Sequence, residues 1–115
     1  MAQDQLSVSI EGGTVRGRAE GDLVSFKGIP FAQPPVGAWR WRAPQPVQPW
    51  QGVREASAFG PDPVQPPTPG TAPWPMSEDC LYLNVWRPAA DTGQPLPVLV
   101  WIYGGLLSEG AGRVM

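Results

Sequence analysis

The chain has 115 residues and a mass of 12.4 kDa, which is the size of one small domain. Glycine and proline reach 14 and 16 residues, a level typical of disorder, but six tryptophans and a 42% hydrophobic share favour a packed protein. The net charge of −2, from 8 basic and 10 acidic residues, excludes the concentrated positive charge of a nucleic-acid-binding protein.

Two further features of the sequence bound its location and its chemistry. No apolar stretch approaches the roughly 20 residues that span a bilayer, and no signal peptide is visible at the N-terminus. We therefore expect a cytoplasmic protein with no membrane partner. Histidine is absent, so no base or metal ligand within this chain can be an imidazole.

The first 30 residues predict three short strands. Apolar and polar residues alternate in residues 7–10, 14–16 and 24–27, and Gly-containing turns separate these runs at residues 11–13 and 20–22. Period-two alternation between such turns is typical of β-hairpins, so we predict one antiparallel meander.

Residues 30–75 contain most of the proline. Seven prolines fall between Pro61 and Pro75, which excludes a regular helix or a central strand there and predicts polyproline II or irregular coil. Within the earlier half, residues 53–58 predict a single helical turn.

Two apolar runs follow, and both predict strands. Residues 80–86 alternate, with Leu81, Leu83 and Val85 on one face. Residues 97–103 are apolar throughout, which favours a strand buried on both faces, antiparallel to the first because the connection is too short for a crossover helix. No amphipathic helix is predicted to cover such a strand, so the sequence is interpreted as the opening part of a larger α/β domain.

Three segments, residues 26–44, 77–88 and 100–105, carry a family resemblance. Together they closely resemble the N-terminal region of type-B carboxylesterases, the family of para-nitrobenzyl esterases and cholinesterases. The Ser77-Glu-Asp-Cys-Leu motif is highly specific, and the resemblance extends over about residues 13–112.

The resemblance implies the N-terminal portion of an α/β-hydrolase fold, with residues 1–115 forming part of one domain that stops before the nucleophile elbow. The family cleaves carboxylic esters through an acyl-enzyme, with a serine, a histidine and an acidic residue, none of which is matched in this chain. By position, the amides of Gly105 and Leu106 would belong to the oxyanion hole, and Gly104 would shape the turn. The expected partners are a small-molecule ester and the remainder of the hydrolase domain, without cofactor or metal.

The glycine pair suits that role on chemical grounds as well. A tetrahedral intermediate needs fixed N–H donors about 3 Å from its oxyanion, and glycine allows close backbone approach and a positive φ. A plain strand-to-loop turn is the alternative for Gly104-Gly105. Leu106 departs from the glycine or alanine usual in the family, and its side chain is expected to crowd the site or to oppose the required φ.

The lone cysteine also departs from the family pattern. Many members have a cysteine where this chain has Asp62 and Pro63, so the family-type partner of Cys80 is absent. We therefore expect Cys80 to be a buried, inert thiol.

Adjacent carboxylates at Glu78 and Asp79 suggest acid–base chemistry. Neighbouring residues of an extended chain point to opposite faces, however, so a structural ion pair is favoured instead. The candidate partners are Arg40, Arg42 and Arg54.

Other candidates have an ordinary structural interpretation beside a functional one. The Tyr103 hydroxyl is a candidate for the substrate mouth, whereas Ser108 is expected to be a loop serine, because it lies outside an elbow motif and has no histidine. Four tryptophans either line an acyl or quaternary-ammonium pocket or pack the long coil. They are Trp39, Trp41, Trp50 and Trp74.

Two non-enzymatic functions stay open at this level. Leu106 is compatible with a catalytically inactive fragment or an interaction module on the same fold, as in adhesion proteins that resemble cholinesterases. Residues 63–66 and 66–69 are proline-rich candidates for binding to SH3-like domains.

Overall fold

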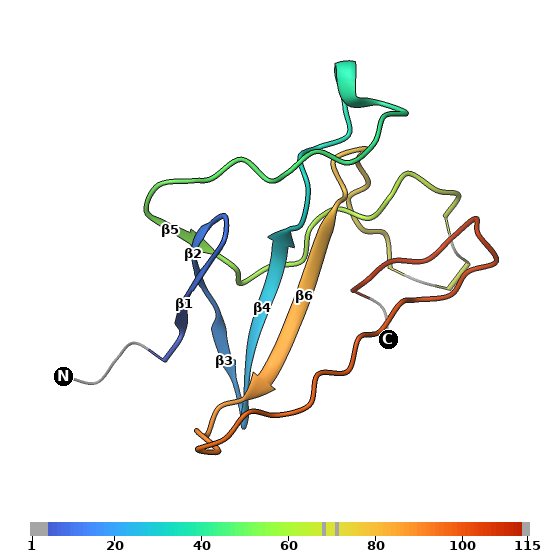
Figure 1. Ribbon diagram of the computed structural model, residues 1–115. Helices are drawn as coiled ribbons and strands as arrows, with labels where there is room; N and C mark the ends of the chain where they lie inside the picture. The colour runs from blue at the N-terminus through green and yellow to red at the C-terminus, as the bar shows by residue number, and fades with distance from the viewer. Residues whose placement is uncertain (1–4, 68, 71, 114–115) are drawn as a thin grey trace.

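The computed structural model describes residues 5–67, 69–70 and 72–113. This part of the chain forms two small three-stranded sheets joined by long coil, with a single turn of 3₁₀ helix (Figure 1). The elements are β1 (Ser7–Ile10), β2 (Gly13–Arg16), β3 (Arg18–Glu20), β4 (Leu23–Pro30), η1 (Gly37–Trp39), β5 (Val53–Glu55) and β6 (Tyr82–Pro88). Over these described ranges, no helix has the length and apolar character needed to cross a bilayer.

The first sheet has the strand order β1-β2-β5. β1 and β2 form the predicted hairpin, with Val8 opposite Val15, and β5 pairs in parallel with the other edge of β2. The helical turn predicted for residues 53–58 is therefore wrong. The open edge of β2 offers backbone N–H and C=O groups to Val53–Glu55, and this distant pairing outweighs the local helical tendency.

Trp50 fixes the hairpin turn of the first sheet. Its indole lies so close to the turn that a β-carbon on Gly12 would meet the ring at 2.5 Å, and one on Gly13 would meet it at 2.7 Å. The indole Nε1 also donates a hydrogen bond of 2.9 Å to the carbonyl of Thr14. This tryptophan thus packs the coil onto the sheet, and it requires glycine beneath the ring.

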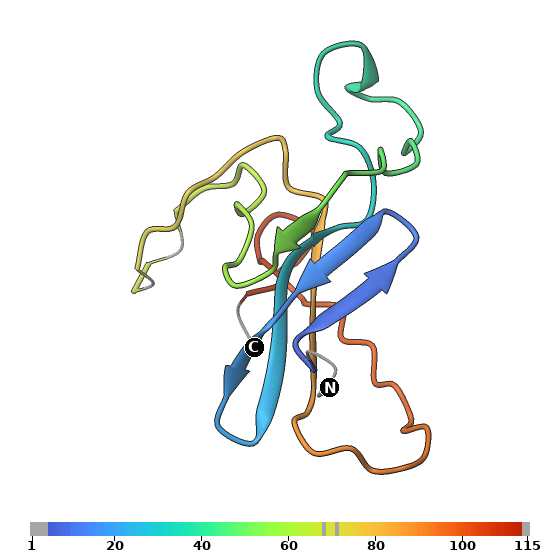
Figure 2. The same cartoon turned by 90° about the vertical axis from the view of Figure 1, so that its left-hand side faces the viewer.

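The second sheet has the order β3-β4-β6, with β4 antiparallel to both neighbours. β3 was not predicted, and the expected single meander is divided between two sheets. The chain passes from one sheet to the other at Gly17, where a β-carbon would lie 2.5 Å from the Ser25 carbonyl oxygen and 2.8 Å from the Phe26 ring. Glycine at this crossing lets β2 and β3 continue almost directly into each other (Figure 2).

The core lies between these two sheets. Val15 of β2 and Ala56, which follows β5, pack against three apolar residues of β4, and all of them are buried. Those β4 residues are Val24, Phe26 and Ile29. The alternation predicted for residues 24–27 is thus confirmed as the strand that supplies most of the core.

The second predicted strand region differs between its two runs. β6 confirms the run at 80–86, displaced by two residues, although Leu83 and Val85 are 40% and 44% exposed. Residues 97–103, predicted as a buried strand antiparallel to β6, are coil, and Leu99 is 91% exposed (Figure 1). The prediction is wrong because a strand needs a hydrogen-bonding neighbour, and none of the described segments pairs with this run.

Candidate functional site

The predicted oxyanion residues lie in a tight loop at residues 104–109, directly after the exposed apolar coil. The Gly105 carbonyl accepts backbone hydrogen bonds from Ser108 (3.0 Å) and Glu109 (3.1 Å). Gly105 has φ +147°, and a β-carbon there would lie 1.8 Å from the Glu109 carbonyl oxygen. Only glycine can occupy this position, as expected for a backbone that folds back on itself.

Leu106 and Leu107 adopt a conformation that is rare for their residue type. Their φ angles are +53° and +66°, in the left-handed region that branched side chains avoid. Their side chains are essentially fully exposed. The backbone at Leu106 thus takes the positive φ that its β-carbon opposes, while the oxyanion role of Gly104, Gly105 and Leu106 stays a prediction.

Gly110 packs closely against the start of this loop. This glycine has φ +115°, and a β-carbon on it would lie 2.5 Å from the Gly104 carbonyl oxygen and 2.7 Å from the Tyr103 ring. Gly110 therefore lies directly against Gly104, the glycine expected to shape the turn. Tyr103, a candidate for the substrate mouth, packs its ring on this return segment and is 39% exposed.

Three polar side chains from distant parts of the sequence hold residues 110–113. The Gln65 amide donates to the Gly110 carbonyl (3.0 Å) and accepts from its N–H (2.6 Å). Asn84 of β6 donates to the Gly112 carbonyl at 3.2 Å and accepts at 3.0 Å from the N–H of Gly28 on β4. Through Asn84 the return segment is tied to the second sheet.

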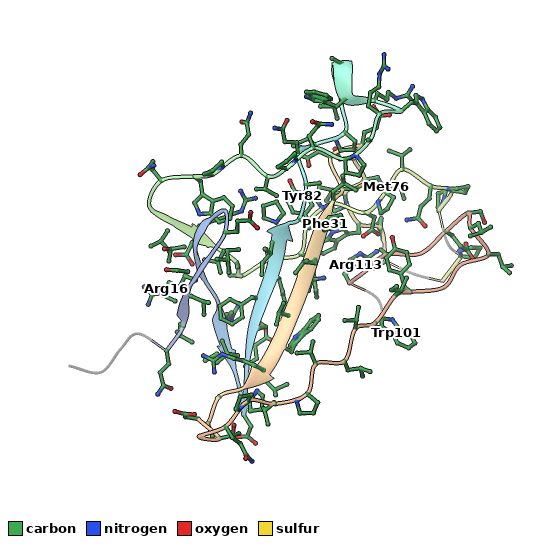
Figure 3. All side chains as sticks on the ribbon, viewed as in Figure 1. Arg16, Phe31, Met76, Tyr82, Trp101 and Arg113 are labelled. Carbon is green, nitrogen blue, oxygen red and sulfur yellow. The ribbon has the colours of Figure 1, made fainter. Side chains whose placement is uncertain are left out.

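The third contact is an ion pair between Arg113 and Asp62. Arg113 is labelled on the return segment in Figure 3. Its Nε and Nη2 each lie 2.8 Å from a carboxylate oxygen of Asp62, which is 6% exposed. The Trp74 ring centroid lies 5.1 Å from the guanidinium carbon, which adds a cation–π contact. Two charge-assisted bonds in parallel fix the orientation of Arg113 as well as its position.

Asp62 also closes the base of the loop at residues 62–76. Its N–H donates to the Pro75 carbonyl at 2.9 Å, and its carbonyl accepts from the Ser77 N–H at 3.0 Å. These two bonds join the two ends of the loop through the Asp62 backbone.

Cys80 is a free thiol, half-buried rather than buried. Burial and the nearby Asp79 and Glu78 carboxylates raise its pKa. The thiol therefore stays protonated at neutral pH, in agreement with the expected inert cysteine.

The adjacent carboxylates have separate structural partners. Glu78 accepts a hydrogen bond of 2.6 Å from Arg40, one of the three arginines expected to pair with it. Asp79 accepts one of 2.8 Å from the Tyr82 hydroxyl, whose pKa is raised by burial and by this contact. They form no shared acid–base pair.

The four tryptophans are not brought together. Trp50 covers the β1–β2 turn, Trp74 meets Phe59 edge-on at 6.4 Å, and Trp41 is 89% exposed. No ring contact joins two of the four within the described residues. They do not line a common pocket. The packing interpretation fits Trp50 and Trp74, whereas Trp41 is mostly exposed and Trp39 is 43% exposed.

Of the two proline-rich segments considered for binding to SH3-like domains, the structure describes only the first completely. Within residues 63–66, Gln65 is engaged by Gly110 and by the Pro63 carbonyl, so this stretch is partly occupied within the molecule. The alternative at residues 66–69 includes position 68, which lies outside the described residues.

Sequence reasoning missed most of the residues that hold the candidate loop. Gln65 carries no periodic or motif signal, and the motif that contains Asn84 gives no sign of its contacts, since each side chain acts on backbone far away in the sequence. Asp62 was noticed only as a replacement for cysteine. Gly110 was not singled out from the sequence either, although its positive φ makes it a close partner of Gly104.

Comparison with known proteins decides the family. A model of the carboxylesterase family matches residues 4–115. The chain belongs to the carboxylesterase family. Phenmedipham hydrolase of Pseudarthrobacter oxydans is 49% identical over 109 residues, covering 89% of this chain and 22% of that protein. Para-nitrobenzyl esterase of Bacillus subtilis (strain 168) is 43% identical over 109 residues, covering 91% and 22%.

Solved structures agree with the sequence comparison. A para-nitrobenzyl esterase structure superposes with a TM-score of 0.85 at 44% identity, over 94% of this chain and 22% of that chain. The carboxylesterase EST55 of Geobacillus stearothermophilus gives 0.80 at 45% identity, over 91% and 21%. These neighbours confirm the α/β-hydrolase fold class, and the present segment is its strand-rich part with almost no helix. The chain spans about a fifth of the length of these relatives.

Proposed function

We propose that residues 1–115 supply the N-terminal part of a serine carboxylesterase domain, contributing sheet strands and part of the oxyanion hole. The observation that carries the proposal is the loop at Gly104–Leu106. Position 105 requires glycine, because a β-carbon there would lie 1.8 Å from the Glu109 carbonyl oxygen. Gly110 packs closely against Gly104 at the start of the loop. Family membership supplies the chemical class, the hydrolysis of esters.

In this proposal the catalytic serine, histidine and acid come from polypeptide outside the present residues. The serine oxygen attacks the ester carbonyl carbon while the histidine takes its proton. The carbonyl oxygen becomes an oxyanion, to which the N–H groups of Gly105 and Leu106 donate. The histidine then protonates the departing alcohol, and water hydrolyses the acyl-enzyme by the same steps. Loss of one such donor lowers kcat by about 10²–10³.

The test is to isolate the native protein that contains these residues and to measure its denatured mass and its hydrolysis of para-nitrophenyl acetate. We expect a mass several times 12.4 kDa and serine-dependent hydrolysis. A longer native protein that hydrolyses no ester would contradict the proposed activity. A 12.4 kDa native protein with full activity would contradict the proposed division of the catalytic machinery.

A second function, a non-catalytic interaction module on the same fold, is favoured by one observation. Leu106 stands where the family usually has glycine or alanine, and its exposed side chain, with that of Leu107, offers apolar surface to a partner. The two functions separate on the complete polypeptide. An intact Gly-x-Ser-x-Gly elbow with a downstream histidine supports the esterase, and a replaced serine supports the module.

A further inference from the structure

We propose that Gln65 is a positioning residue for the candidate oxyanion loop. This inference rests on the proposed function and extends it to a side chain outside the loop. Gln65 lies on the proline-rich segment at residues 62–76, about 40 positions before the loop in sequence, and it reaches the loop through Gly110.

Every hydrogen of the Gln65 amide nitrogen is used. Nε2 donates to the carbonyls of Pro63 (3.2 Å) and Gly110 (3.0 Å), while Oε1 accepts from the Gly110 N–H at 2.6 Å. Two carbonyls and one N–H as partners allow only this orientation of the amide. The side chain therefore pairs with Gly110 reciprocally, as one strand residue pairs with another.

Gly110 passes this restraint directly to Gly104. The two glycines are so close that a β-carbon on Gly110 would lie 2.5 Å from the Gly104 carbonyl oxygen. A shift of Gly110 would thus displace or release Gly104, the residue that shapes the predicted turn. Among the described residues, Gln65 alone forms side-chain hydrogen bonds with Gly110.

The segment that carries Gln65 is itself anchored. Pro63, which accepts from the amide, follows Asp62, and Asp62 is fixed by Pro75, Ser77 and Arg113. Arg113 lies three residues beyond Gly110, so the two segments are joined at two points. Figure 3 labels Arg113 on this return segment and Trp101 on the coil that leads into the loop. Gln65 is the contact nearer to the candidate donors.

The first experiment compares Gln65→Ala with Gln51→Ala in the complete esterase. Gln51 is an exposed glutamine outside this cluster and serves as the matched control. We expect Gln65→Ala to lower kcat by about 10- to 100-fold with KM changed by less than about twofold, because misplaced donors weaken transition-state binding. The affinity for a trifluoromethyl ketone, a transition-state analogue, should fall in parallel. The control should leave both unchanged.

The conservative variant Gln65→Glu separates positioning from a loss of folding. At neutral pH its carboxylate cannot donate to the Gly110 carbonyl, whereas the protonated carboxyl at low pH can. The ratio of its kcat to that of the wild type should therefore rise as the pH falls through the usual glutamate range, about 4 to 5. A ratio that does not change with pH would contradict the proposal.

A second measurement does not depend on catalysis. The N–H groups of Ser108 and Glu109 donate to the Gly105 carbonyl and do not touch Gln65. Hydrogen exchange at these two amides should be at least about tenfold faster in Gln65→Ala, because the loop then opens more often. Unchanged exchange overturns the proposal. A wild-type protein without hydrolysis defeats the proposed function instead, and the exchange rates still decide whether Gln65 holds the loop.

Discussion

Two similar apolar sequences in this molecule differ in structure: one forms a buried strand, and the other is exposed coil. In β4, Val24 and Phe26 are 2% and 4% exposed, because β3 and β6 pair with the strand and the other sheet covers it. In the coil at residues 97–103, Val98 and Leu99 are 87% and 91% exposed. An apolar, β-branched run becomes a strand only where a neighbouring edge satisfies its backbone.

The loop that follows the exposed coil is ordered by a different means. The side chains of Gln65 and Asn84 form hydrogen bonds to the backbone of the return segment, residues 110–113. The Asp62 carboxylate accepts hydrogen bonds from Arg113 of the same segment. The first half is thus stabilised by burial of apolar surface, and the second half is stabilised by specific polar contacts. Substitutions in each half distinguish these two sources of order.

The largest effect is expected in the core between the sheets. Phe26→Ala should lower the free energy of unfolding by about 3 kcal/mol, because it removes a buried ring and leaves a cavity. Val98→Ala, at an exposed position of the coil, should change it by less than about 0.5 kcal/mol. Urea unfolding followed by tryptophan fluorescence measures both. Equal effects would contradict the contrast between the two regions.

The next effect tests the polar contacts of the second half. Asp62→Ala should lower the free energy of unfolding by about 2 kcal/mol, because it removes the charge-assisted hydrogen bonds to the largely buried Arg113 guanidinium. Glu78→Ala removes the exposed ion pair with Arg40 and should cost less than about 1 kcal/mol. Thermal unfolding of the two variants gives the comparison. A larger loss for Glu78→Ala would show that the return segment is not held by Asp62.

A smaller effect is expected at the strained turn. Leu106→Gly relieves a left-handed leucine but adds freedom to the unfolded chain, so we expect a net stabilisation of about 0.5 kcal/mol. Leu99→Gly, at an exposed position without positive φ, gains no such relief and should destabilise slightly. Denaturant midpoints measure both changes. Destabilisation of equal size in the two variants would mean that φ at Leu106 carries no strain.

The smallest effect concerns the pH dependence of Cys80. Its pKa is raised in the folded protein, so the neutral thiol is favoured and any stability gained is present below the unfolded pKa. That gain is lost as the pH rises through the folded pKa. The same shift lowers the thiolate fraction, so iodoacetamide at pH 8 should alkylate the folded chain more slowly than the urea-unfolded chain. Equal rates would contradict the raised pKa.

The sequence predicts the parts of the fold whose signals are local. Alternation identifies β1, β2, β4 and β6, because their apolar faces alternate along the chain. β3 is three residues long and exposed, and β5 forms only because β2 offers it an edge. The glycines of the candidate loop were found from motif and chemistry, whereas the partners of Gly110 and Arg113 lie about 45 and 51 positions away and leave no local signal.

We propose that this chain contributes to an ester-hydrolysing site without containing its nucleophile. A fluorophosphonate probe, which labels activated serines, tests it on both the pure 115-residue chain and the native protein that contains it. Peptide mapping then locates the labelled serine. We predict no stoichiometric label on the chain, and one labelled serine in the native protein at a position outside residues 1–115. Stoichiometric labelling within these residues, for example at Ser108, would contradict the account.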